Sequence, residues 1–211
     1  MTRQRHLVIF ARLPQAGRGK RRLAAGIGTV QALRFQRVRL AILVKRHARD
    51  PRWKTWLAIT PDRSGPWPSS VRTVAQGRGD LGQRMARVFF ILPKGPAVIV
   101  GTDIPGMTAG AIVRAFHALG RHDAVFGPAT DGGYWLIGLK RTPKRLSPFA
   151  NVRWSTGYTL ADTERNLTQA SIAYIDRLDD VDDTQSLQRQ NTWARLCPSR
   201  SGSVSAKGNS Q

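Results

Sequence analysis

Two aspartates stand where a carboxylate could take part in chemistry, each just after a short apolar segment. Asp103 follows Ala97–Val100 in the run Gly-Thr-Asp-Ile-Pro-Gly, and Asp131 follows Ala124–Phe126 in a loop that continues with a glycine pair. Short, β-branched apolar runs are typical of strands buried on both faces of a parallel sheet. Open α/β sheets bind their ligands beyond the carboxyl ends of such strands. We therefore expect both carboxylates to face one crevice.

Either aspartate alone could instead be a helix cap or a turn residue, roles in which aspartate is common. The glycines favour a site, because Gly132 and Gly133 would let a ligand come close to the backbone after Asp131. Two carboxylates, each on a glycine-rich strand exit, indicate a binding or catalytic site more strongly than two unrelated caps.

A basic, glycine-rich loop over residues 12–23 follows another predicted strand, Leu7–Ala11. Backbone N–H groups of such a loop can surround a phosphate, and Lys or Arg can neutralise its charge. The loop is not a Walker P-loop, which would need glycine at Pro14 and Ser or Thr at Arg21, and its glycine spacing does not fit the dinucleotide fingerprint. A solvated basic turn is the alternative. If the loop binds phosphate, we expect the Lys20 side chain to be exposed.

Two further segments contain candidate ligand groups. Gln76–Met85 combines glycines with Asp80, which opens a predicted helix whose free N–H groups suit an anion or a polar base edge. A plain capped turn is the alternative there. Near the other end of the chain, four carboxylates lie between Asp179 and Asp183. They could supply one or two oxygen ligands to a divalent metal, or they could be acids at a helix N-terminus.

The chain is strongly basic, with 34 Lys and Arg against 13 Asp and Glu and a formal net charge of +21. Such a charge attracts polyanions. The basic residues are scattered, however, and belong to no nucleic-acid module, so we interpret them as solvated faces and expect no nucleic-acid partner. The single cysteine, Cys197, excludes an internal disulfide framework. We predict no signal peptide or membrane anchor, and a cytoplasmic protein.

The length of 211 residues suits one α/β domain, which we place at residues 1–197. Residues 198–211 are rich in Ser, Gly and Lys and predict a disordered tail. The segment Tyr134–Leu139 is predicted to be an antiparallel strand, because its connection to the preceding strand is very short. Further strands are predicted at 56–60 and 71–75, and helices at 29–47, 80–90, 108–119 and 159–169.

The predicted helix at 29–47 has apolar residues mostly at helical spacing, with basic residues in between. This pattern predicts a surface amphipathic helix. The apolar residues that would form its buried face are Val30, Leu33, Val38, Ala41, Ile42 and Val44.

Five motifs occur in one order along the chain. They are Leu7-Val-Ile-Phe-Ala-Arg-x-Pro-x-x-Gly-x-x-Lys20, Gln76-Gly-x-Gly-Asp-Leu-Gly-x-Arg-Met85, Gly101-Thr-Asp-Ile-Pro-Gly106, Val125-Phe-Gly-Pro-Ala-x-Asp-Gly-Gly-Tyr-Trp135 and Asp180-Val-Asp182. Together they resemble the family often labelled rSAM/selenodomain-associated transferase, or arsenosugar-biosynthesis glycosyltransferase. This resemblance implies a single-domain, Rossmann-like GT-A fold of the nucleotide-diphospho-sugar transferases, with a central mixed, mostly parallel sheet flanked by helices. Within that fold, the family is similar to molybdenum-cofactor guanylyltransferases and phospholactate guanylyltransferases.

The resemblance also implies site residues on the nucleotide side. The residues that would line the nucleoside pocket are Asp80, Leu81 and Gly82. The residues that would hold the nucleotide phosphates are Arg12, Gly17, Arg18, Lys20 and Arg22. The family usually has Lys-Thr-Arg where this chain has Lys-Arg-Arg at positions 20–22, so a hydroxyl is lost there.

For the catalytic side, the resemblance implies two catalytic aspartates and a divalent cofactor, Mg²⁺ or Mn²⁺. Asp103 would bind the metal, and Asp131 would face the acceptor or help the metal. Asp182 would complete the metal site, with Asp180 and Asp183 as competing ligands. The residues on the acceptor side would be Gly132, Gly133, Tyr134 and Trp154.

These expectations favour a metal-dependent, glycosyltransferase-like enzyme that uses a nucleoside-diphosphate sugar and an unidentified small-molecule acceptor. One alternative is a nucleotidyltransferase that uses a nucleoside triphosphate and releases pyrophosphate. A second alternative is a non-catalytic protein that binds nucleotides or nucleic acid. The sequence leaves the oligomeric state open.

Overall fold

A computed structural model describes residues 4–15, 20–61, 67–104, 106–143 and 146–178 of the chain. The predicted domain end at residue 197, the predicted tail and the acidic turn at 179–183 all lie outside these ranges.

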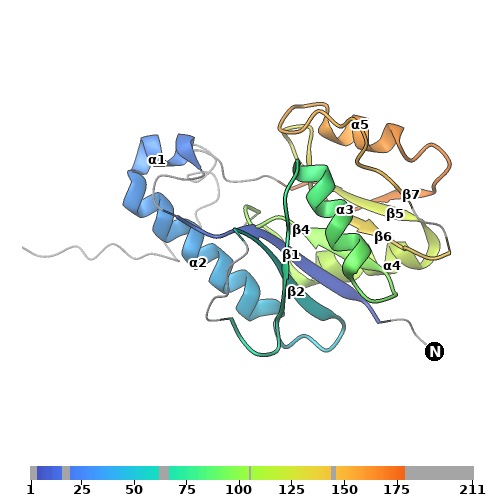
Figure 1. The fold of residues 1–211 in the computed structure, drawn as a ribbon, viewed down its shortest axis with the longest axis horizontal. Helices are drawn as coiled ribbons and strands as arrows, with labels where there is room; N and C mark the ends of the chain where they lie inside the picture. The colour runs from blue at the N-terminus through green and yellow to red at the C-terminus, as the bar shows by residue number, and fades with distance from the viewer. Residues whose placement is uncertain (1–3, 16–19, 62–66, 105, 144–145, 179–211) are drawn as a thin grey trace, which may run out of the picture.

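A seven-stranded sheet forms the centre of the fold (Figure 1). Its order is β3-β2-β1-β4-β6-β5-β7, and every strand runs parallel to β1 except β6. This confirms the predicted mixed, mostly parallel sheet and the antiparallel strand, while the short edge strand β7 was not predicted. The strands are β1 His6–Arg12, β2 Lys54–Thr60, β3 Arg72–Ala75, β4 Ala97–Val100, β5 Ala124–Pro128, β6 Tyr134–Leu139 and β7 Ile172–Tyr174.

Two corrections concern the helices of the described part of the chain. A helix at Arg21–Ile27 was not predicted, and the last helix ends at Arg165, not Gln169. None of the described helices is long and apolar enough to cross a membrane. The helices are α1 Arg21–Ile27, α2 Thr29–His47, α3 Leu81–Ile91, α4 Ala109–Arg121 and α5 Thr159–Arg165.

Side-chain caps fix where two helices begin. The Thr108 hydroxyl accepts a hydrogen bond from the backbone N–H of Ala111 at 3.1 Å, which starts α4. At α3, the Asp80 carboxylate accepts from the Gln83 N–H at 2.7 Å, and the Gln83 side chain accepts from the Asp80 N–H at 3.1 Å. These bonds satisfy N–H groups that have no partner inside a helix.

The helices cover the sheet on both faces, so the fold has three layers (Figure 1). Alternation along β1 shows why, because Leu7 and Ile9 point to one face and Val8 to the other. On the first face they pack with α2 and α4, and on the second with α3. A sheet buried on both faces explains why these strands are almost continuously apolar.

The buried face of α2 differs from the prediction. Val30 is 76% exposed, although it was expected to belong to the buried face. The residues of α2 that are buried are Ala32, Phe35, Arg39, Leu40, Leu43, Val44 and His47. A charged residue therefore lies in the middle of the face that packs inward.

Candidate functional site

The two predicted aspartates follow neighbouring strand ends at one edge of the sheet. Asp103 comes three residues after the end of β4, and Asp131 three residues after the end of β5. Strand β6 starts between them. Gly101 N–H donates to the carbonyl of Trp135 in β6, and Ala129 N–H donates to the carbonyl of Gly133, the residue before β6, each at 3.0 Å. The sheet order thus holds the two carboxylates at one place.

A cavity of about 270 Å³ lies at this edge, and Asp103 and Asp131 both line it. One wall is apolar and comes from β1, α3, β4 and β6, while the other comes from the segment after Arg153. The lining residues are Phe10, Leu81, Met85, Ile99, Gly101, Thr102, Asp103, Ile104, Ala129, Asp131, Gly133, Tyr134, Trp135, Ile137, Trp154, Ser155, Thr156 and Thr159. A concave, mostly apolar pocket with a few convergent polar groups is the usual form of a small-molecule site.

Asp103 has a cationic neighbour in this structure. The Lys20 Nζ lies 3.2 Å from Asp103 Oδ2, and the side chains are 6% and 45% exposed, respectively. The prediction that Lys20 would be exposed was therefore wrong, because its ammonium packs against the protein to reach the carboxylate. On the other oxygen, the Thr102 hydroxyl donates to Asp103 Oδ1 over a long 3.4 Å.

A second cation near Asp103 was missed in the sequence. Arg39 of α2 is only 7% exposed, and its Nε has no hydrogen-bond partner among the described residues. Burial lowers its pKa, the charge of Arg46 lowers it further, and the attraction of Asp103 raises it. Arg46 itself donates from Nη1 to the carbonyl of Met107 at 3.2 Å, at the end of the Asp103 loop. Helix α2 therefore brings positive charge to this loop, from the buried Arg39 and the exposed Arg46.

The turn that carries Asp131 is held by glycines. Asp131 Oδ1 accepts from the Gly133 N–H at 2.9 Å, which leaves its second oxygen available to the cavity. Gly132 has φ +84°, and a Cβ there would lie 2.2 Å from the carbonyl oxygen of Gly157. Leu160 N–H also donates to the Gly132 carbonyl at 3.0 Å. The turn is therefore pressed against residues 157–160, and only glycine fits at its centre.

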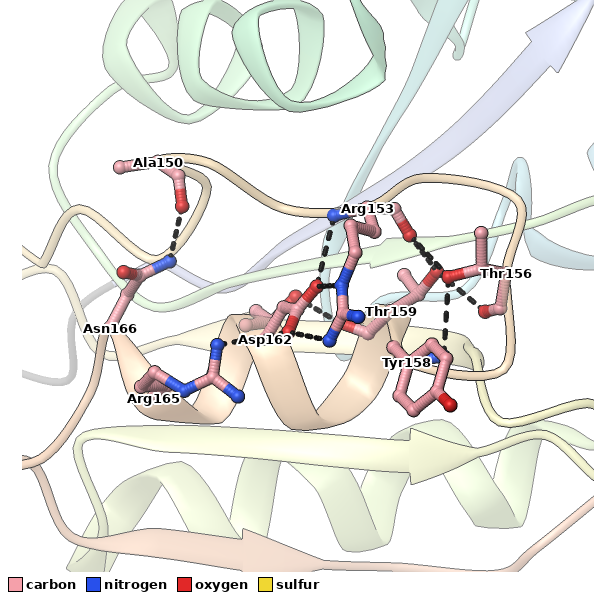
Figure 2. Close-up of polar contacts among 9 residues, drawn as sticks. Ala150, Arg153, Thr156, Tyr158, Thr159, Asp162, Arg165 and Asn166 are labelled. Atoms are coloured by element: carbon pink, nitrogen blue, oxygen red, sulfur yellow. Dashed lines mark hydrogen bonds and ion pairs between the residues drawn. The ribbon is translucent and has the colours of Figure 1, made fainter.

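A buried acid fixes the facing wall (Figure 2). The Asp162 side chain is 2% exposed, and its Oδ2 accepts from the backbone N–H and the Nε of Arg153 at 3.1 and 2.8 Å. Its Oδ1 accepts from Arg153 Nη2 at 2.9 Å and from Arg165 Nη1 at 3.1 Å. The bidentate hydrogen bonds from Arg153 lower the pKa of Asp162 well below its usual range. We call residues 153–162 the Arg153 wall.

Hydroxyl groups complete the Arg153 wall (Figure 2). Thr156 and Thr159 both donate to the carbonyl of Arg153, at 2.8 and 2.9 Å. The Arg153 guanidinium carbon lies 4.1 Å from the centre of the Tyr158 ring. Ser155, which lines the cavity, has φ +59°, a conformation that costs energy for a residue other than glycine. The hydrogen bonds that Thr156 and Thr159 make to the Arg153 carbonyl therefore hold the backbone on either side of Ser155.

The three residues predicted to line the nucleoside pocket, at the start of α3, have different surroundings in the structure. Leu81 lines the cavity, whereas the Asp80 carboxylate serves as the helix cap described above. Gly82 is buried, and a Cβ there would lie 2.6 Å from the Trp154 ring and 2.9 Å from Phe149. Its lack of a side chain lets Trp154 close against α3, beside the cavity.

The structure brings together only part of the predicted site. Arg12 and Arg22 are exposed and do not line the cavity, although they belong to the same region of the chain as Lys20. Burial raises the pKa of Tyr134, which lines the cavity, so its hydroxyl stays neutral. The predicted site residues that lie outside the described ranges are Gly17, Arg18 and Asp182, together with Asp180 and Asp183.

The described residues can be tested as ligands for a divalent cation. Among them, no three His, Cys, Asp or Glu side chains come together in a metal-binding group. Mg²⁺, however, is usually held by one or two carboxylates together with substrate phosphates and waters. Asp103 and Asp131 are hard oxygen donors that line the same cavity. They fit such a phosphate-assisted site, and do not form a cage made of protein ligands alone.

Comparison of the sequence with known protein families identifies the family of this chain. Residues 29–156, more than half of the chain, match the family described as "Uncharacterized protein conserved in bacteria (DUF2064)". The chain is a member of this family. No curated protein sequence matches the DUF2064 chain.

Solved structures share the fold of this DUF2064 protein. A protein of Desulfovibrio desulfuricans G20, provisionally named a nucleotide-diphospho-sugar transferase, is 24% identical with a TM-score of 0.82, over 92% of this chain and 91% of that one. The 4-diphosphocytidyl-2C-methyl-D-erythritol synthase of Anaerococcus prevotii DSM 20548 is 8% identical with a TM-score of 0.54, over 92% and 99% of the chains. A CMP:2-keto-3-deoxy-manno-octonic acid synthetase complexed with CTP is 10% identical with a TM-score of 0.55, over 91% and 98%. The first of these likenesses agrees with the predicted nucleotide-diphospho-sugar transferase fold.

Proposed function

We propose that this DUF2064 protein is a metal-dependent transferase that takes a nucleoside-diphosphate sugar as donor. The observation that carries the proposal is the pair of strand-end carboxylates, Asp103 and Asp131, lining one cavity with the Lys20 ammonium beside the first. Ligands of open α/β sheets bind at this edge. The provisional name of the Desulfovibrio desulfuricans protein supports a sugar-nucleotide donor.

The residues can be assigned to the two parts of a glycosyl transfer, which are departure of the diphosphate and attack by the acceptor. In that reaction the bond between the anomeric carbon and the diphosphate oxygen breaks, and an acceptor oxygen bonds to the carbon while losing its proton. Asp131 has a carboxylate oxygen available to take that proton, or to add a ligand on the donor side. Lys20 would place its positive charge at the diphosphate, where negative charge builds up as the bond breaks.

A divalent cation would be held by Asp103 together with the donor phosphates, and by Asp182 from outside the described residues. When bound, such an ion neutralises charge on the departing diphosphate. The cavity wall contributes by shape, because Trp154 and Tyr134 line the same cavity as the two carboxylates.

Nucleotidyl transfer is the second candidate, and the likeness to two cytidylyl-type enzymes favours it. In that reaction the acceptor oxygen bonds to the α-phosphorus of a nucleoside triphosphate, and pyrophosphate leaves. The same carboxylates and the same lysine would serve, because both reactions expel a phosphate-containing anion. The product that accumulates separates the two: a nucleoside diphosphate in one case, pyrophosphate in the other.

A thermal-shift screen tests the proposal. Nucleoside diphosphates, nucleoside triphosphates and nucleotide sugars are each added with Mg²⁺, with Mn²⁺ or with EDTA. A ligand present at one hundred times its Kd stabilises the native state by about 2.7 kcal/mol. We expect at least one nucleotide class to raise the Tm in the presence of metal only. If no nucleotide does so with either metal, the proposed function is wrong.

The non-catalytic alternative is separated by ionic strength and by turnover. A protein that binds nucleic acid loses affinity steeply as salt rises, whatever the sequence bound. A metal–nucleotide site should respond mainly to the divalent ion. Binding that requires metal, without release of either product from any donor, would indicate a nucleotide sensor and not a transferase.

A further inference from the structure

The ion pair between Lys20 and Asp103 has a consequence for the proposed metal site. The Lys20 ammonium contacts the same Asp103 carboxylate that the proposed function assigns to a divalent cation. A cation already paired with one oxygen of a carboxylate repels a second cation at the same group, so each weakens the binding of the other. We propose that Lys20 acts as a built-in competitor for the cation at Asp103, which makes metal and nucleotide bind cooperatively. This inference rests on the proposed function and adds to it how the site is loaded.

The burial of the two side chains shows which partner can be exchanged. Lys20 is 6% exposed, whereas Asp103 is 45% exposed and lines the cavity. An ammonium withdrawn from water needs an anionic partner, because its lost hydration is otherwise not replaced. Among the described residues, Asp103 is such a partner. A phosphate group arriving in the cavity would offer a second anion to the same ammonium.

The backbone at Lys20 is also unusual. This residue precedes α1 with φ 39° and ψ 48°, in the left-handed region that side chains other than glycine seldom adopt. Conformations of this kind persist where the surroundings determine them, and they cluster at ligand sites. The strain is consistent with a lysine whose position is set by its charge partner and not by the helix that follows.

The positive field around Asp103 does not come from Lys20 alone. Arg39 of α2 is buried, and the charge of Asp103 raises its pKa against the larger lowering by burial. Arg46 contacts the carbonyl of Met107 at the end of the same loop. A dication that approaches Asp103 is therefore opposed by the charges of Lys20 and Arg39 before any phosphate is present. Without nucleotide, we expect metal binding at this carboxylate to be weak.

Nucleotide binding reverses this balance. Donor phosphates bring negative charge that pairs with Lys20, and the Asp103 carboxylate then becomes free for the metal, which also contacts the phosphates. Each ligand thus removes an obstacle to the other. Because coupling between two binding sites is reciprocal, metal should tighten nucleotide binding by the same factor by which nucleotide tightens metal binding.

The test compares Mn²⁺ binding, followed by the electron paramagnetic resonance of free Mn²⁺, in the parent, in Lys20→Met and in Arg21→Met. Arg21 is the exposed neighbouring cation, so its loss changes net charge equally without touching Asp103. With Mn²⁺ alone, we expect Lys20→Met to bind at least about tenfold more tightly than the parent, since one competing charge is gone. Arg21→Met should match the parent. Lys20→Gln serves as a second neutral variant if the methionine disturbs the fold.

The second half of the test adds UDP or GDP. In the parent, either nucleotide that binds should tighten Mn²⁺ binding, and in Lys20→Met this factor should be smaller, because only the direct contact between metal and phosphate remains. Equal or weaker Mn²⁺ affinity of Lys20→Met without nucleotide would overturn the inference. That outcome differs from failure of the proposed function, in which no nucleotide would bind the parent in a metal-dependent way. A parent with metal-dependent nucleotide binding but no effect of Lys20→Met would leave the function standing and remove only this inference.

Discussion

Two carboxylates close to the cavity are used in opposite ways. Asp162 is 2% exposed and accepts hydrogen bonds from Arg153 and Arg165 with both oxygens. Asp103 is 45% exposed, and within the described part of the chain it makes an ion pair with Lys20 and a long hydrogen bond with Thr102. The first acid is fully committed to the protein, whereas the second keeps much of its surface open to the cavity. The difference separates an acid that builds the site from one that is available to a ligand.

The same contrast applies to the cations. Arg153 makes a bidentate, charge-assisted pair with Asp162, and its loss would leave the buried carboxylate with the single side-chain contact from Arg165 among the described residues. The Lys20 Nζ lies 3.2 Å from one oxygen of a half-exposed carboxylate, without the bidentate geometry of the Arg153 pair. An ion pair that is open to the cavity can be exchanged for a ligand, because an arriving phosphate replaces the carboxylate as the anionic partner of the ammonium. Stability measurements should therefore distinguish the two regions, and the following changes test this from the largest expected effect to the smallest.

Gly132→Ala should have the largest effect. The substitution forces a side chain into the left-handed region and against the Gly157 carbonyl, where the nearest atom would be 2.2 Å away. Strain and overlap together should lower the free energy of unfolding by at least about 3 kcal/mol. Gly120→Ala is the matched control, because a Cβ there meets nothing within 4 Å, and it should gain up to about 1 kcal/mol. Similar urea midpoints for the two variants would show that the Asp131 turn is not packed as described.

Asp162→Asn should have the next largest effect. The amide group of asparagine would turn N–H donors towards the guanidinium of Arg153 or Arg165, which donate as well. We expect the Tm to fall by several degrees. Asp176→Asn removes an acid from an exposed pair with Arg114 and should change the Tm little. If both variants melt together, the Arg153 wall does not depend on its buried acid.

The pH dependence of the free energy of unfolding tests the role of Asp162 independently. Because the pKa of Asp162 is lower in the folded protein than its ordinary 3.8, the unfolded chain binds a proton more readily. The stability that this carboxylate contributes is complete above about pH 4 and is lost as the pH falls further, through the folded pKa. Urea titrations between pH 5 and pH 2 should show a smaller loss in Asp162→Asn than in the parent. If the free energy of unfolding falls equally with pH in both proteins, the Asp162 carboxylate does not stabilise the fold as described.

Asp131→Asn should have the smallest effect on stability. Asparagine keeps an oxygen that can accept from the Gly133 N–H, so the turn is retained. We expect a change within about 0.5 kcal/mol in the free energy of unfolding. Turnover, once a donor is known, should fall sharply, because the carboxylate charge is gone. A large loss of stability would place Asp131 with Asp162 among the acids that build the fold.

Local signals made much of this fold predictable from the sequence. The apolar run Ala97–Val100 is β4, Thr29–His47 is α2 at its predicted bounds, and Thr108 caps α4 as expected. These features depend on residues close in sequence, whose spacing or capping chemistry indicates the element directly. The aspartates were found in the same way, because a carboxylate just past a buried strand is placed by the sheet itself.

Features that depend on distant contacts were missed. The buried face of α2 was misassigned because Arg39 was treated as a surface residue, although its spacing from Phe35 and Leu43 fits a single helix face. The pairing of Lys20 with Asp103 joins segments far apart in the chain, and no local pattern predicts it. The hydrogen bonds around Asp162 are not indicated by any helical or strand periodicity in the sequence either. Buried charge was therefore the hardest part of the site to predict.

The most direct test of the central claim is a titration of Mn²⁺ and the stabilising nucleotide into the parent and into Asp103→Asn. Asparagine preserves the size of the side chain and is itself a good capping residue, so a purely structural Asp103 should tolerate it. We predict a normally folded variant whose nucleotide affinity no longer depends on Mn²⁺. Equal metal-dependent affinity in the two proteins would contradict a metal site at Asp103, and with it the proposed transferase.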